Sequence, residues 1–87
     1  MLDAVKLSLR LMDDTFDTEV KDIIEGCRYD LKLAGIVKYS DDDPLILRAV
    51  TLYAKGHFGF ANTGEKFLQS YESLRNSLCL AGDYTNA

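Results

Sequence analysis

The apolar residues of this chain recur at intervals of three and four, the spacing that places side chains on one face of an α-helix. The broadest stripe follows Asp43, which suits a helix cap, and Pro44, which suits the first helical position. Its members are Leu45, Ile46, Ala49, Val50, Tyr53, Gly56 and His57. Because this face is too wide to leave in water, we expect a helix over residues 43–58 at the centre of a small bundle.

Two further long helices are predicted to pack around this central one. Residues 15–34 begin with an acidic turn and are followed by Gly35, which suits the left-handed residue that ends a helix. Residues 63–81 follow a capping-box pattern at Asn62 and Glu65. The side chains expected to form the core are Phe16, Val20, Ile23, Ile24, Cys27, Leu31, Leu45, Ala49, Val50, Tyr53, Phe67, Tyr71, Leu74 and Leu78.

Residues 3–12 are ambiguous when the pattern is considered alone. Residues 5–11 alternate apolar and polar side chains, which is typical of a half-buried strand. We nevertheless predict a helix, because a single strand would have no partner in an otherwise helical chain. The two faces of this helix would hold Leu2, Val5, Leu9 and Met12 on one side, and Leu7 and Leu11 on nearly the opposite side. A helix with two apolar faces needs a partner beyond its own core.

The expected fold is therefore all-α, a small bundle of four helices over approximately 3–12, 15–34, 43–58 and 63–81. The length of 87 residues allows one domain with a thin core, which we place at residues 1–82. The polar residues 83–87 are expected to form a short, flexible C-terminal tail. The connection from Ile36 to Asp42 is apolar for a loop, so part of it should pack down.

Composition and charge narrow the possible functions. The net charge of −4 argues against a protein whose main task is to grip nucleic acid, because that task needs a concentrated basic face. The single histidine and the two widely spaced cysteines form no known catalytic or metal-binding motif, so we expect no enzyme activity, metal or cofactor. No stretch is long and apolar enough for a membrane span, and we expect reduced thiols and synthesis in a reducing cytoplasm.

Four segments, in their order and spacing, resemble a known family. They are LDAVKLSLRL (2–11), DTFDTEVKDIIEGCRYDL (14–31), DPLILRAVTLYAKGHFGF (43–60) and EKFLQSYESLRNSL (65–78). Together they are similar to the small head–tail connector, or adaptor, proteins of tailed bacteriophages and prophages, which are often called DNA-packaging proteins. The resemblance covers nearly the whole chain.

This resemblance implies a non-catalytic virion component at the head–tail junction. It implies a subunit that assembles with copies of itself into a ring, commonly twelve-fold, which lies under the portal protein and extends the DNA channel toward a downstream tail-completion protein. DNA would then be a passing, weakly contacted substrate, and no membrane would be involved. From exposure and pattern, we place candidate contacts between subunits at Leu7, Leu11, Ile36, Val37 and Tyr39, and a candidate partner-docking tail at Asp83 and Tyr84.

The main alternative is a different helical interaction module, such as a small regulator or an antitoxin-like partner. Such a protein would act as a stable dimer or as one half of a defined heteromer, whereas a connector would form larger assemblies. The mass of the assembled protein is the observation that separates the two.

Overall fold

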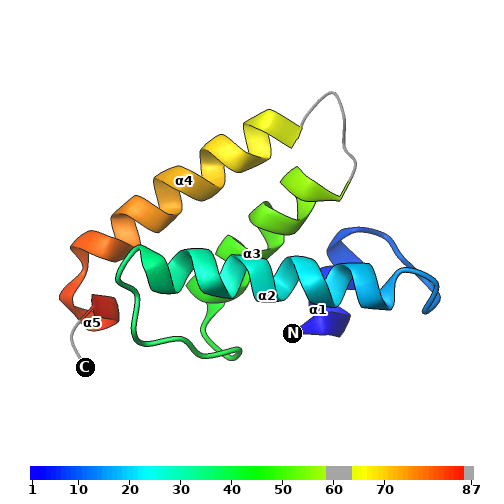
Figure 1. Cartoon of the computed structure of the whole chain (residues 1–87), viewed down its shortest axis with the longest axis horizontal. Coiled ribbons are helices and arrows are strands. Elements are labelled where there is room, and N and C mark those ends of the chain that lie inside the picture. The colour runs from blue at the N-terminus through cyan, green and yellow to red at the C-terminus, as the bar shows by residue number, and fades with distance from the viewer. Residues whose placement is uncertain (59–63, 86–87) are drawn as a thin grey trace.

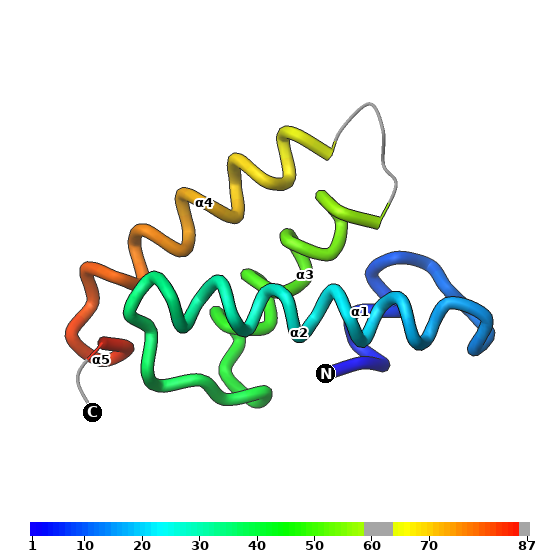
Figure 2. Tube along the Cα trace, in the orientation of Figure 1, coloured from blue at the N-terminus to red at the C-terminus, as the bar shows by residue number. Residues whose placement is uncertain are grey.

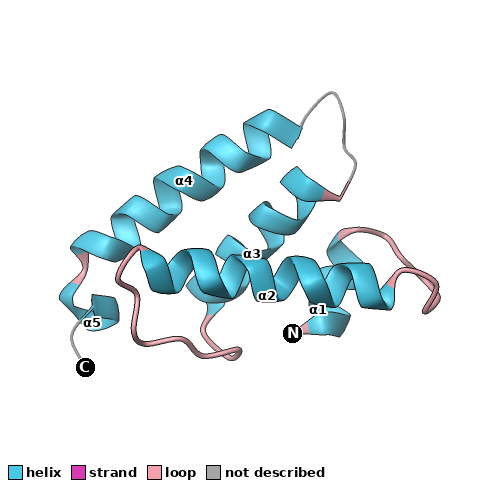
Figure 3. Cartoon of the chain, viewed as in Figure 1, coloured by secondary structure: helices cyan, strands magenta, loops and turns pink. Residues whose placement is uncertain are grey.

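The computed structural model describes residues 1–58 and 64–85, which form five helices and contain no strand (Figures 1 and 3). The helices are α1 (Leu2–Ser8), α2 (Asp17–Leu33), α3 (Pro44–His57), α4 (Gly64–Leu80) and α5 (Gly82–Thr85). The expectation of an all-α bundle with four main helices is confirmed. Asn62 and Thr63, part of the expected capping box, lie outside the described residues.

Helix α3 is the central element of the bundle. It packs against α4 along much of its length and also contacts α2 and α1 (Figure 2). Helix α1 lies beside the first half of α2, and α5 follows the end of α4. The described chain measures 38 × 25 × 19 Å along its principal axes. The central position expected for the broadest apolar stripe is therefore confirmed.

Local sequence signals explain where two helices begin and end. Asp43 has an extended backbone conformation, and its Oδ1 accepts a hydrogen bond of 2.8 Å from the amide of Leu45, so it caps α3 as expected. At the end of α2, Gly35 has a φ of +101°, the left-handed conformation that glycine adopts without strain. The amide of Gly35 donates to the carbonyl of Lys32, and that of Ile36 donates to Leu31. This pair of bonds is a Schellman motif.

The core combines side chains from the first four helices and from the connections on either side of α2. Its buried members are Val5, Leu9, Val20, Cys27, Leu31, Ile36, Ile46, Ala49, Val50, Ala54, Tyr71 and Leu78. Half of the expected core set is thus fully buried. Four more expected members, Ile23, Ile24, Tyr53 and Leu74, are partly buried against this cluster, and Phe67 is also partly buried.

Three apolar residues expected to face the interior are exposed instead. Phe16 is 43 % exposed because α2 begins only at Asp17, so the aromatic ring precedes the helical stripe and packs edge-on against Phe58. Leu45 is also 43 % exposed, in the first turn of α3 beside the buried Ile46. Met12 is 89 % exposed because α1 ends at Ser8 and the helical spacing ends with it.

The C-terminal residues up to Thr85 do not form a free tail. They form the single turn α5, and the Tyr84 carbonyl accepts hydrogen bonds from the amides of Val37 (2.8 Å) and Lys38 (3.1 Å). The hydroxyl of Tyr84 donates to Oδ2 of Asp43 at 2.8 Å. The flexible tail expected for residues 83–87 is therefore corrected for residues 83–85, which bind the α2–α3 connection.

Replacing Ile46 with alanine tests the core. The side chain is fully buried in α3, so its truncation leaves a cavity and should lower the free energy of unfolding by about 2–5 kcal/mol. Leu45→Ala is the matched control, since the neighbouring side chain is half-exposed and should cost about 1 kcal/mol or less. Urea denaturation followed by circular dichroism measures both. Equal losses in the two variants would contradict this assignment of the inward face.

Candidate interaction surfaces

The described residues carry no cluster of three His, Cys, Asp or Glu side chains that could hold a metal ion. None of the helices within residues 1–58 and 64–85 is long and apolar enough to cross a membrane. Exposed apolar side chains are candidates for contacts with other proteins, and six of the eight large ones among the described residues lie near the two ends of α2, while Leu45 and Leu80 lie in α3 and α4.

One end of α2 carries acidic and apolar side chains together, and we call it the acidic end. It consists of Leu7 in α1 and of Met12, Asp13, Asp14 and Phe16 in the α1–α2 connection. All five side chains are exposed, Leu7 at 72 %. An ion pair of 2.6 Å between Lys6 Nζ and Asp17 Oδ1 fixes α1 beside the start of α2. Figure 1 shows this connection as the blue loop next to α1.

The other end of α2 carries basic and apolar side chains, and we call it the basic end. It consists of Arg28, Tyr29, Lys32 and Leu33 in α2 and of Val37 in the α2–α3 connection. All five side chains are exposed, Leu33 at 84 %. A groove of about 300 Å³ lies here, lined by Arg28, Lys32, Ile36, Val37 and Tyr39. At a rise of about 1.5 Å per residue, Arg28 and Lys32 lie roughly 16 to 23 Å along the axis of α2 from Asp17, where the helix begins.

The five candidate subunit contacts differ in how exposed they are. Leu7 and Val37 are exposed and available for a partner. Leu11 and Tyr39 are partly buried against the core, and the Tyr39 hydroxyl contacts the sulfur of Met1. Ile36, a candidate subunit contact in the loop of which part was expected to pack down, is only 3 % exposed and lies in the core. The reason is the Schellman motif, which folds the residue after Gly35 back under the helix end, where an apolar side chain commonly packs.

Tyr84, the candidate docking residue of the tail, is engaged within its own chain. It is partly buried and lines a groove of about 540 Å³ with Lys38 and Asp43, whereas Asp83 on the same groove is exposed. The hydrogen bond from Tyr84 also lowers the pKa of Asp43, which therefore remains charged as the cap of α3. A partner that takes up Tyr84 would have to replace this bond.

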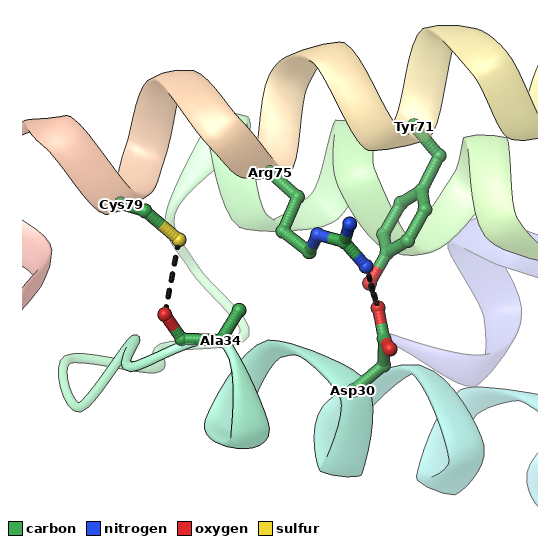
Figure 4. A network of polar contacts seen from close by, with 5 residues as sticks. All are labelled: Asp30, Ala34, Tyr71, Arg75 and Cys79. Atoms are coloured by element: carbon green, nitrogen blue, oxygen red, sulfur yellow. Dashed lines mark hydrogen bonds and ion pairs between the residues drawn. The ribbon is translucent and has the colours of Figure 1, made fainter.

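A polar network that the sequence analysis missed holds α4 against α2 near the basic end. Asp30 Oδ2 accepts hydrogen bonds from the hydroxyl of Tyr71 at 2.5 Å and from Nη1 of Arg75 at 2.8 Å (Figure 4). One turn further along, the thiol of Cys79 donates to the carbonyl of Ala34 at 3.2 Å. The partners are 41 to 45 residues apart in the sequence, so helical periodicity gives no sign of them.

The environment of this network sets its ionisation. Burial by itself would raise the pKa of Asp30, but the hydrogen bonds from Tyr71 and Arg75 outweigh it, so the pKa lies below the ordinary value. Burial, and then the bond to Asp30, raise the pKa of Tyr71 far above its usual range. Burial also raises the pKa of Cys27 to about 12, which keeps this thiol protonated and unreactive.

A helical domain with chemically different contact surfaces at its two ends is the kind of protein that works by assembling with others. The profile of the phage connector protein family matches residues 1–85, and the chain belongs to this family. It is therefore a structural, non-enzymatic virion component with a head–tail connector role, and it interacts with other phage virion proteins. No curated protein and no solved structure matches the chain. The resemblance seen in the sequence is confirmed.

The Asp30 network predicts how stability changes with pH. A carboxyl group whose pKa is lowered by folding stabilises the protein above its unfolded pKa, and this contribution is lost as the pH falls through the folded pKa. The parent should therefore lose free energy of unfolding between about pH 5 and pH 2, and Asp30→Asn should show a smaller loss. Asp22→Asn removes an exposed charge from the same helix and is the control. Parallel pH curves for Asp30→Asn and the parent would contradict the proposed network.

The contact of α5 with the α2–α3 connection predicts a local effect of truncation. A chain ending at Ala81 lacks the carbonyl that receives the Val37 and Lys38 amides, so these two amides should exchange with deuterium markedly faster. The amide of Val20, which donates to the carbonyl of Phe16 at the start of α2 and has no contact with α5, is the control and should change less. Unchanged exchange at Val37 and Lys38, measured by NMR, would mean that α5 does not protect them in solution.

Proposed function

We propose that the protein forms a ring of identical subunits, about twelve in the virion, at the head–tail junction. One side of the ring contacts the portal protein and the other contacts a tail-completion protein, so the ring extends the DNA channel toward the tail. The subunits are made in the cytoplasm of the host bacterium and reach the virion by assembly. This proposal refines the connector role that the family assigns.

The observation that supports the ring is the presence of different exposed surfaces at opposite ends of α2. A ring requires a heterologous contact, in which each subunit offers two different patches and uses each once. The acidic end and the basic end meet this requirement, because both expose large apolar side chains and they lie toward opposite ends of α2. A two-fold dimer would instead use one self-complementary patch.

The charge of the chain suits a DNA conduit. Phosphate groups bind strongly to concentrated lysine and arginine, and such a lining would hold the genome in place. The net charge of −4 opposes such retention. DNA would pass the ring with weak contacts.

The ring is tested by measuring mass with light scattering over a wide concentration range, for the protein alone and with the portal protein of the same phage. We expect an assembly of about a dozen copies, either alone at high concentration or on the portal. A dimer that persists at every concentration and ignores the portal would overturn the ring and favour the small interaction module. The helical circular dichroism signal serves as the control for folding.

A further inference from the structure

We propose that residues 12–16 of one subunit, the second part of the α1–α2 connection, dock on the basic end of the next subunit. Asp13 and Asp14 would face Arg28 and Lys32 of the neighbouring copy, and the flanking apolar side chains would pack beside the groove. This contact rests on the proposed ring and specifies the interface that builds it.

The basic end is a preformed receptor for a carboxylate with an apolar neighbour. Arg28 and Lys32 are one helical turn apart on the same face of α2, and the Arg28 guanidinium carbon lies 5.1 Å from the centre of the Tyr39 ring. The side chains lining the groove include these two cations and no carboxylate. Its apolar surface comes from Ile36, Val37 and the Tyr39 ring.

Arg28 and Lys32 form no strong ion pair within their own subunit, among the described residues. Arg28 reaches Glu25 at 3.8 Å, but both side chains are about 60 % exposed, and such a pair on a helix surface contributes little. Lys32 makes no ion pair with any residue in the described part of the chain. Both can therefore bind a carboxylate from outside the subunit.

The α1–α2 connection has the complementary composition and a fixed shape. Asp13 Oδ1 accepts a hydrogen bond of 3.1 Å from the Thr15 amide, which closes a tight turn. Asp13 and Asp14 form no ion pair within residues 1–58 and 64–85. Met12 and Phe16 flank them, and both are exposed. This segment thus offers two carboxylates between two apolar side chains.

The fold prevents these two surfaces from meeting inside one subunit. They lie toward opposite ends of α2, roughly 16 to 23 Å apart along its axis, and helix α2 is continuous between them. The contact must therefore join different copies, and each copy then has one donor segment and one receptor groove. The other exposed acidic pair, Asp41 and Asp42, belongs to the α2–α3 connection at the basic end and is flanked by Ser40 and Asp43 rather than by exposed apolar side chains.

Disulfide trapping tests the contact directly. In Asp14→Cys/Lys32→Cys, the two new thiols are too far apart to join within one chain, so a bond between them links two copies. Because every copy has both thiols, oxidation should give a ladder of dimers, trimers and larger products on a non-reducing gel. Asp22→Cys/Lys32→Cys, with two exposed thiols on α2, is the control and also reports on Cys27 and Cys79. A ladder that ends at dimers, or equal ladders in both variants, would overturn the contact.

Charge exchange tests the same contact without cross-linking. Asp13→Lys/Asp14→Lys and Arg28→Glu/Lys32→Glu should each raise the concentration for half-assembly by roughly tenfold or more, because like charges then face each other. An equal mixture of the two variants should assemble again, since each mutant surface finds its opposite charge on the other variant. Circular dichroism confirms that both variants fold.

The results of these experiments distinguish a failure of the docking contact from a failure of the ring proposal. If the parent assembles and the charge variants assemble equally well, the ring stands and the docking contact is wrong. If the parent forms no large assembly even with the portal protein, the ring proposal fails. Loss of assembly in both variants without recovery in the mixture also overturns the docking contact.

Discussion

The fold depends on the need to bury the broad apolar face of α3 within a chain of only 87 residues. Helices α1, α2 and α4 all contact α3, and small residues let them approach closely. A Cβ atom added to Gly64 would lie 3.0 Å from the carbonyl oxygen of Gly56, so the start of α4 meets the end of α3 nearly backbone to backbone. At Gly26, an added Cβ would lie 3.3 Å from the Tyr53 hydroxyl, which leaves little room for a side chain between α2 and α3. Every main helix packs on α3, and most of the large apolar residues left exposed lie near the two ends of α2.

The polar network between α2 and α4 complements this thin core. Asp30 lies at the core boundary, where an unpaired carboxylate would be costly, and the Tyr71 hydroxyl and Arg75 guanidinium both bind the same oxygen. The hydrogen bonds to Asp30 require a particular distance and direction between their atoms. Contacts between apolar side chains are less directional and would allow α4 to shift along α2. The hydrogen bonds therefore fix the position of α4 along the second half of α2. The basic end, which lies on this half of α2, is held in place by the same bonds.

The sequence predicted what depends on local pattern. The central stripe, the cap at Asp43 and the left-handed Gly35 are all readable within a few residues, and the structure confirms them. The failures occur where helical spacing stops being a guide: Met12 and Phe16 fall outside the ends of their helices. Ile36 is a different case, because the residue after a C-terminal glycine often packs back on its helix, and this signal was present in the sequence. The Asp30 network and α5 depend on contacts between residues far apart in the chain, which no local pattern reveals.

Asp43 uses both of its carboxylate oxygens, and this links two distant parts of the chain. Oδ1 holds the first turn of α3, while Oδ2 holds the hydroxyl of Tyr84 in the last described helix. A proton on this one carboxyl group, or a competing ligand for the tyrosine, would disturb both attachments together. The central helix and the chain terminus are in this way thermodynamically coupled through a single side chain. Loss of the Tyr84 hydroxyl would therefore act on the first turn of α3 through the same carboxylate.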